Sequence, residues 1–115
     1  MKFMLLIHGD EQAMMANTTD DATGMSPEYA AYNQALIKAG ALLEGERLQL
    51  TRTAASVRVR NGKTEVVDGP YAETREQFGG YYIIEAGDLA AAVDWATQCP
   101  GSLYGTVEVR PVSLS

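Results

Sequence analysis

The charged side chains best suited to chemistry are concentrated in one stretch, residues 68–80. That stretch contains Asp68, Glu73, Arg75 and Glu76, between Gly69-Pro70 at one end and Gly79-Gly80 at the other. Gly-Pro sets a turn, and paired glycines allow the backbone to approach a neighbouring group closely or to take a positive φ. The loop is therefore held at both ends. A carboxylate in such a turn can orient a substrate or take a proton, and an arginine can clamp an anion. The structural alternative is that Asp68 caps a short turn at 71–76 and Arg75 pairs with an acid. Both interpretations stand.

His8 is the only histidine in the chain, and it follows an apolar run and precedes Gly9-Asp10-Glu11. An imidazole beside an acid can act as a general base. It can also be a strand-end residue with satisfied hydrogen bonds, and this simpler interpretation is somewhat favoured. A metal site is not expected, because His8 and the single cysteine, Cys99, lie far apart in the sequence.

Cys99 lies on the apolar stripe of an expected helix, where a thiol is packed and unreactive. The chain contains no nucleophile elbow, no phosphate-binding loop and no glycine pattern for a dinucleotide. We therefore expect no cofactor.

Composition narrows the class of protein. With 115 residues, of which 46% are apolar and 21% charged, the chain resembles one soluble domain. Its formal charge of -6 argues against nucleic acid and anionic membranes as partners. The apolar run at residues 1–7 is too short to span a bilayer, and no signal-peptide pattern is clear. A single cysteine fits a reducing compartment, so we expect the cytoplasm.

Alternating and helical spacings predict the elements that would position these side chains. Helices are expected over 27–39 and about 89–98, strands over 2–8, 41–48, 81–85 and 105–112, and a hairpin over 57–67. Ser26 and Asp88 are good N-caps for the two helices. The core stripe of the second helix is expected to contain Leu89, Ala92, Val93, Ala96 and Cys99. Gly45 is a candidate bulge, and residues 9–25, with a short helix at 11–16, form either a lid or an insertion.

The hairpin is the clearest local pattern in the chain. Asn61-Gly62 is a typical type I′ turn sequence, because both residues tolerate a positive φ. A two-residue turn pairs Arg60 with Lys63 and Arg58 with Glu65. One face of the hairpin is then apolar, and the charged face is left to solvent.

The order of elements predicts an α+β fold: a ferredoxin-like split β-α-β domain of residues 1–115 with an added β-hairpin. In this topology the first and third core strands are central, which agrees with the apolar side chains on both faces of 2–8 and 80–85. The helices cover one face of the sheet. Because the other face also carries apolar side chains, we expect a second subunit to cover it in a homodimer.

Four strings of residues resemble a known family. They are Met-Lys-Phe-Met-Leu-Leu-Ile at the start, Val-Asp-Gly-Pro-Tyr-Ala-Glu-Thr-Arg-Glu-Gln in the middle, Gly-Gly-Tyr-Tyr after it, and Val-Glu-Val-Arg-Pro-Val near the end. Nearly the whole chain resembles the YCII-related family, and in particular its DGPF branch. There an Asp-Gly-Pro-Phe-Ala-Glu-Thr-Lys-Glu string is usual, and Tyr71 and Arg75 replace its Phe and Lys.

This resemblance implies a dimeric α/β-barrel form of the ferredoxin-like fold, with a small-molecule pocket near the interface. Most members have no assigned activity, and one relative is a dehydrochlorinase. DGPF members are often encoded near extracytoplasmic-function sigma factors. Some relatives carry a His–Asp pair suggested to be catalytic, but those positions align with Tyr29 and Cys99, which cannot do the same chemistry.

Two classes of function follow. The first is a lyase- or hydrolase-like enzyme with His8 and Asp68 as catalytic residues. In it, Tyr71, Glu73, Arg75 and Tyr82 bind the substrate. The second is a non-catalytic dimer that binds a metabolite or has a regulatory role, linked to sigma-factor signalling. A pocket that unites His8 with Asp68 would favour the enzyme, and an open acidic pocket without a base would favour the binding protein.

Overall fold

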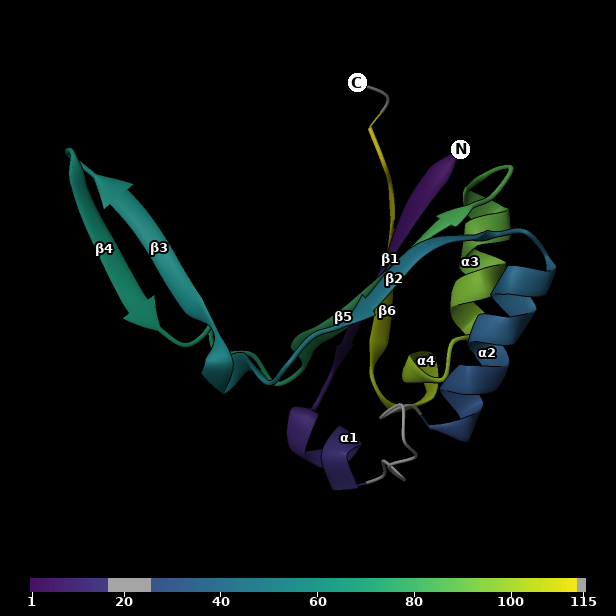
Figure 1. Ribbon diagram of the computed structural model, residues 1–115, viewed down its shortest axis with the longest axis horizontal. Helices are drawn as coiled ribbons and strands as arrows, with labels where there is room; N and C mark the ends of the chain where they lie inside the picture. Colours follow the sequence, from purple (N-terminus) through teal and green to yellow (C-terminus); the bar gives the residue numbers. More distant parts are fainter. Residues whose placement is uncertain (17–25, 114–115) are drawn as a thin grey trace.

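The computed structural model describes residues 1–16 and 26–113, and its centre is a four-stranded sheet (Figure 1). The strands are β1 (Lys2–Gly9), β2 (Leu42–Arg47), β5 (Gln77–Glu85) and β6 (Thr106–Pro111), in the order β2-β5-β1-β6. All neighbouring pairs are antiparallel. β1 and β5 are therefore central, as expected from their two apolar faces, and the domain is a mixed α+β fold of the split β-α-β type.

Two helices cover one face of this sheet. They are α2 (Pro27–Lys38) and α3 (Leu89–Gln98), which lie side by side in Figure 1. Both begin at the predicted caps, because the side-chain oxygen of Ser26 accepts a hydrogen bond from the Tyr29 amide (3.3 Å) and that of Asp88 accepts one from the Ala91 amide (2.8 Å). The uncovered side is called the open face below.

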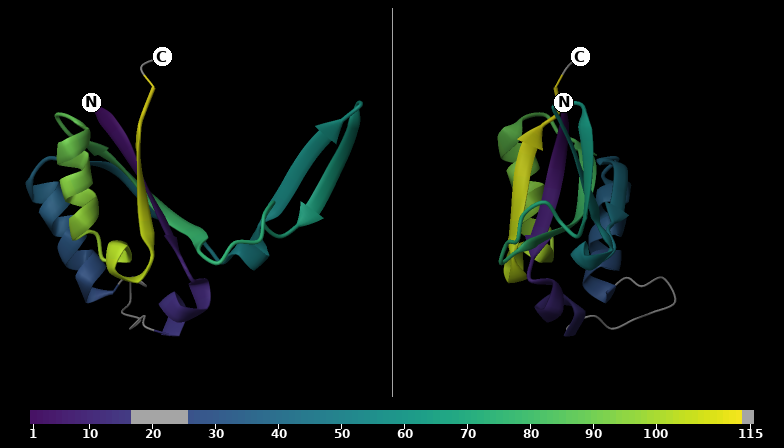
Figure 2. Two further views of the ribbon diagram at one scale, coloured as in Figure 1. Left: turned by 180° about the vertical axis from the view of Figure 1, so that it is seen from behind. Right: turned by 90° about the vertical axis from the view of Figure 1, so that its left-hand side faces the viewer.

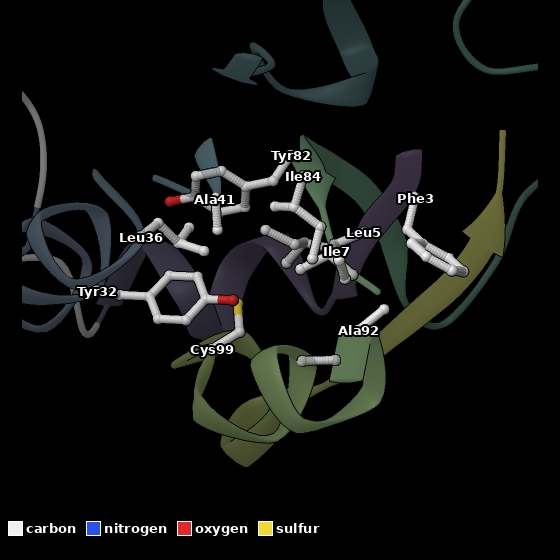
Figure 3. Close-up of a cluster of buried hydrophobic side chains, with 12 residues drawn as sticks. Phe3, Leu5, Ile7, Tyr32, Leu36, Ala41, Tyr82, Ile84, Ala92 and Cys99 are labelled. Carbon is white, nitrogen blue, oxygen red and sulfur yellow. The ribbon is translucent and has the colours of Figure 1, made fainter. Parts of the chain in front are cut away.

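The core lies between the sheet and the two helices (Figure 3). Its largest fully buried side chains are Phe3, Leu5, Leu36, Ile84 and Cys99. In a strand, successive side chains point to opposite faces, so Phe3, Leu5 and Ile7 point to the helices while the residues between them point to the open face. On the open face, Met4, Leu6, Tyr81 and Ile83 are only half-buried.

The predicted core stripe of α3 is partly wrong. Ala92, Ala96 and Cys99 are buried as expected, but Leu89 is 51% exposed and Val93 is 42% exposed. The buried side of the helix carries small side chains, with the larger Trp95 at its edge packed against the core cluster. Apolarity at helical spacing does not say which of two adjoining stripes meets the sheet.

Three further boundaries differ from expectation. β5 begins at Gln77, so part of the predicted polar loop is strand, because Gln77 and Phe78 pair with the end of β1. The irregularity in β2 falls between Leu42 and Glu44, not at Gly45. A short helix α4 (Gly101–Tyr104) follows Pro100, between the predicted helix and the predicted last strand. Each difference depends on pairing or packing with a distant segment.

The hairpin of β3 (Ala55–Arg60) and β4 (Lys63–Asp68) has the predicted register. Arg60 pairs with Lys63 and Arg58 with Glu65. The φ angles of Asn61 (52°) and Gly62 (75°) are those of the predicted type I′ turn. The hairpin stands away from the main sheet, as both Figure 1 and Figure 2 show. All of its strand residues except Ser56 are exposed.

The base of the hairpin is tied down by two short segments. One is η1 (Thr51–Thr53), a single turn of 3₁₀-helix, and the other is α1 (Glu11–Ala16). The Glu11 carboxylate accepts hydrogen bonds from the Thr51 amide (2.6 Å) and the Thr51 hydroxyl (2.9 Å). The Glu11 amide donates to the side-chain oxygen of Gln77 (3.0 Å). Glu11 thus connects the end of β1, the hairpin base and the start of β5.

Gly105, just before β6, lies against the backbone at the end of β1. This contact gives a test of how β6 packs beside β1. A Cβ built at Gly105 would overlap the carbonyl oxygen of His8 and lie 2.9 Å from Cα of Gly9, both backbone atoms. Gly105→Ala should therefore lower the free energy of unfolding by about 1–3 kcal/mol through overpacking. Gly87→Ala is the matched control, because a Cβ there meets nothing within 4 Å. Equal denaturant midpoints for the two variants would contradict this seating.

Candidate functional site

The two predicted catalytic residues lie on different parts of the fold. His8 is near the end of β1 on the open face, and Asp68 is the last residue of β4, where it pairs with Ala55. Asp68 is exposed. Among the described residues, no hydrogen bond or ion pair joins Asp68 to His8. Their joint catalytic role stays a prediction.

An acid from the last strand faces His8 instead. Nε2 of His8 lies 3.6 Å from Oε1 of Glu108, and Nε of Arg110 lies 3.8 Å from the other carboxylate oxygen. The Nε2 atom is buried and has no hydrogen-bond partner among the described residues, although the His8 side chain as a whole is 26% exposed. A buried polar atom without a partner is costly, so this nitrogen favours a bound group or a small shift of the carboxylate.

Strand pairing explains why these residues meet. His8 pairs with Thr106, and Glu108 is two residues further along the same face of β6, within diagonal reach. On the other side of β1, the register shifts between Ile7 and His8, so Phe78 stands opposite His8 with ring centroids 5.4 Å apart. Bulges often re-aim side chains beside active sites. Here the bulge places an aromatic ring against the imidazole.

The sequence offered one signal for Glu108. Thr106, Glu108 and Arg110 alternate with apolar residues, which predicted a solvent-facing side of the last strand. That side is now seen to be the open face. The alternation did not show that β6 would pair with β1, and only this pairing brings Glu108 to His8.

A polar hollow lies in the loop before β5. It is open to solvent and is lined by Asp10, Thr74, Arg75 and Glu76. The Thr106 hydroxyl donates a hydrogen bond to Oε1 of Glu76 (2.7 Å), which links the hollow to the strand residue that pairs with His8. Asp10 has a structural role as well, because its carboxylate accepts from the amides that start α1 (3.0 Å and 3.2 Å). The hollow offers an arginine and two acids.

The four predicted substrate-binding residues are dispersed. Arg75 lines the hollow, whereas Tyr71 is 84% exposed and Glu73 is also exposed. Tyr82 points to the helix-covered face, where its hydroxyl donates to the side-chain oxygen of Asn33 (2.5 Å). Of the four, Arg75 is the one that lines the hollow beside the strand residue paired with His8.

Tyr29 and Cys99, the two positions aligned with a His–Asp pair, are in contact. The Cys99 thiol donates to the Tyr29 hydroxyl at 3.8 Å. Cys99 is 1% exposed, as expected for a packed thiol. Burial raises the pKa of the Cys99 thiol and, together with the nearby thiol, that of the Tyr29 phenol. Both groups are thus protonated at neutral pH, and the pair cannot serve as an imidazole–carboxylate base.

Neither a metal site nor a membrane span was found in residues 1–16 and 26–113. No group of three or more His, Cys, Asp or Glu side chains there could hold a metal ion. No helix of these segments is long and apolar enough to cross a bilayer.

Comparison with known proteins identifies relatives along the whole chain. A family model described as the YCII-related domain matches residues 1–114. An uncharacterised protein of Rhizobium meliloti (strain 1021) is 34% identical over 116 residues, which cover 99% of this chain and 94% of the relative. A solved structure is similar in fold, with a TM-score of 0.52 and 14% identity, over 100% of this chain and 96% of the other. It is 5-chloro-2-hydroxyhydroquinone dehydrochlorinase from Burkholderia phenoliruptrix AC1100 in complex with 2,5-dihydroxybenzoquinone.

The buried phenols beside Cys99 predict a loss of stability at alkaline pH. Desolvation, with a smaller contribution from Cys99, raises the pKa of Tyr29, Tyr32 and Tyr82. An unfolded tyrosine loses its proton near pH 10. The stabilisation is therefore present below about pH 10 and is lost as the pH rises toward the higher folded pKa values, because the unfolded state then binds fewer protons. The melting temperature should fall steeply above that pH.

Tyr32→Phe should make this fall shallower, whereas Tyr104→Phe, at an exposed position, should leave the slope unchanged. Parallel alkaline melting profiles for Tyr32→Phe and the wild type would contradict the prediction.

Proposed function

Because this chain belongs to the YCII-related domain family, we propose that it is a homodimer that binds a small molecule on the open face, near the subunit interface. We further propose that it acts as a lyase- or hydrolase-like enzyme with His8 as general base. The observation that carries this proposal is the 3.6 Å approach of His8 Nε2 to Glu108 Oε1 on an incompletely covered sheet face. The proposal thus adds a specific site, His8 with Glu108, to the resemblance to the DGPF branch.

The chemistry follows from the orientation of the imidazole. In this proposal Nε2 carries the proton and donates it to the Glu108 carboxylate after a small approach from the 3.6 Å separation. Nδ1 is then the basic nitrogen, and the carboxylate stabilises the imidazolium once it forms. In a lyase step, Nδ1 would take a substrate proton. The electrons of the broken C–H or O–H bond would form a new π bond, and a leaving group would depart with its own bonding pair. In a hydrolytic step the same nitrogen would take a proton from water.

Arg75 supports a substrate with an anionic or strongly polarised oxygen. Its guanidinium lines the hollow with Asp10 and Glu76, and the Glu76 carboxylate is held by Thr106. Asp68 lies outside the hollow, so in this proposal its carboxylate would act on a bound substrate through its negative charge. The dehydrochlorinase is a chemically related precedent at 14% identity, and its bound quinone is a suitable first probe.

The homodimer is supported by the half-buried apolar side chains of the open face. Met4, Leu6 and Ile83 point away from the helices and are only partly covered in one subunit. A second copy packed on this face would complete the dimeric α/β barrel and place the His8 region near the interface. A stable interface of this kind buries more than roughly 1,000 Å² in total.

A second candidate function is a non-catalytic dimer that binds a metabolite or a regulator, in the sigma-factor context of the DGPF branch. One observation favours it: the hollow is open, has two acids and one arginine in its lining, and includes no histidine. This arrangement can hold a cationic or hydroxylated ligand without moving a proton.

A variant series with a defined probe separates the two functions. Chloride release from 5-chloro-2-hydroxyhydroquinone and thermal shift with 2,5-dihydroxybenzoquinone are measured on the same proteins. If His8 is a general base, His8→Asn should lower turnover by about 10²–10⁴-fold while its melting temperature stays near the wild type. Glu108→Gln should lower turnover less, because it removes only support for the imidazolium. A thermal shift without any turnover in the wild type would favour the binding protein.

Asp68→Asn is the companion variant. Asparagine caps a turn nearly as well as aspartate, so the fold should persist in either case. If Asp68 acts through its charge, the quinone shift or the turnover is reduced. If Asp68→Asn melts and responds to the ligand as the wild type does, the charge of Asp68 has no functional role and the residue is structural.

The homodimer is tested by light scattering at micromolar concentration. The expected mass is about twice that of the 12.4 kDa chain, since the open face requires cover. A single-chain mass at that concentration would refute the dimer but would leave the His8–Glu108 chemistry to be tested by its own variants.

A further inference from the structure

The hairpin of β3 and β4 exposes more apolar surface than its position explains. Val57, Val59, Val66 and Val67 are 58–63% exposed. Val57 pairs directly with Val66, and Val59 lies on the same face, so three of the four valines form one apolar face. A two-stranded hairpin without further packing is at best marginally stable in water. Both of its outer edges are also unpaired within the described chain.

The molecule as a whole is extended for its length. Its radius of gyration is 15.8 Å, compared with about 13 Å for a compact chain of this size. Its accessible surface is 8124 Å², compared with roughly 6,100 Å² expected from its mass. Figure 2 shows that the hairpin projects from the rest of the chain. This projection contributes to the larger radius of gyration and to the larger accessible surface. The surplus surface is comparable with what a stable protein interface buries.

The base of the hairpin is defined by hydrogen bonds of its own and of the segment before it. The Gly69 amide donates to the Ala54 carbonyl (2.6 Å), and the Ser56 hydroxyl donates to the Gly69 carbonyl (2.9 Å), which closes the base of the hairpin. The bonds from Glu11 to Thr51 fix η1 beside α1. These contacts close the base of the hairpin and connect the segment that leads into it with α1. The strands of the hairpin themselves remain exposed along their length.

Charge is distributed unevenly between the hairpin tip and the rest of the chain. Residues 52–63 contain four cations and no acid, although the whole chain has a formal charge of -6. Arg60 and Lys63 flank the turn at the tip. On the main sheet, Glu44 and Glu46 are exposed along β2, on the open-face side next to Ile83 and Tyr81. The tip and the β2 edge are therefore complementary in charge.

We propose that the hairpin of each subunit lies across the open face of a second copy of this chain. The apolar face of Val57, Val59 and Val66 packs on the partner's half-buried apolar residues. Arg60 and Lys63 project from the opposite face of the hairpin, but they flank the turn, and their long side chains extend past the tip to the acids on the partner's β2. A two-fold axis satisfies both hairpins and both open faces at once. The hairpin then also covers the partner's His8 region, so each site is completed by the other subunit.

This inference rests on the proposed homodimer and adds the contact that holds it. A second copy is preferred over an unrelated partner because one chain carries both complementary surfaces: an apolar ribbon with a basic tip, and an apolar sheet face with an acidic edge. Long-range attraction between the tip and the acidic body also favours encounter of two copies.

The first test uses two adjacent valines on opposite faces of the hairpin. Val66→Thr changes the proposed contact face, and Val67→Thr makes the same change on the opposite face at nearly equal exposure, 63% and 59%. Threonine suits a strand, so both hairpins should persist. In sedimentation equilibrium, Val66→Thr should raise the dimer dissociation constant by roughly three- to tenfold through the lost apolar contact. Val67→Thr should leave it unchanged.

The second test uses charge reversal in pairs. Arg60→Glu/Lys63→Glu reverses the tip, and Glu44→Lys/Glu46→Lys reverses the β2 edge. Each double variant alone should associate more weakly than the wild type, because both contacts in its dimer become repulsive. An equimolar mixture should recover dimer, because both contacts in the mixed pair are attractive again. Melting curves of each variant at low concentration confirm that the subunits are folded.

Four outcomes would overturn the arrangement. Equal dissociation constants for Val66→Thr and Val67→Thr would show that the hairpin does not pack in the dimer. Variants that weaken association but do not recover it on mixing would exclude contact between tip and β2. If none of the four variants changes the dimer dissociation constant, the homodimer stands and only the hairpin contact is refuted. A monomeric wild type would refute both.

Discussion

Alternation of side chains along the two central strands is the constraint on which the rest of this structure depends. Every second residue of β1 and β5 builds the core with α2 and α3, and every residue between them must point to a face that has no helix. Ile7 therefore points into the core, and the next residue, His8, points to the open face. The fold and the candidate site are two sides of the same strand, and a change of register by one residue would exchange them.

Local signals in the sequence were sufficient for the elements and for the hairpin. Caps at Ser26 and Asp88 and the Asn61-Gly62 turn act within a few residues, so their chemistry can be read directly from the chain. The exposed positions of Leu89 and Val93 were not predictable in the same way. Which stripe of α3 meets the sheet depends on the fit to side chains of other elements of the fold.

The candidate site was predictable only in part for the same physical reason. His8 and Arg75 were selected from residue type and neighbours, and the structure places both at one end of the sheet. Glu108 was not selected, because its approach to His8 is created by antiparallel pairing of the first and last strands. The bulge that sets Phe78 against His8 is likewise a property of two paired strands. Tyr82 was selected for its type, but the strand directs it to the helices.

The cations of the hairpin have a consequence for the newly made chain. A projecting ribbon with exposed valines, and with both edges unpaired among the described residues, is a template for edge-to-edge aggregation. Arg58, Arg60 and Lys63 interrupt that ribbon at every second position near its tip. Charged residues beside a β-prone segment act as gatekeepers against stacking of identical chains, since like charges in register repel. Neutralising them should therefore make the folded chain more prone to aggregate.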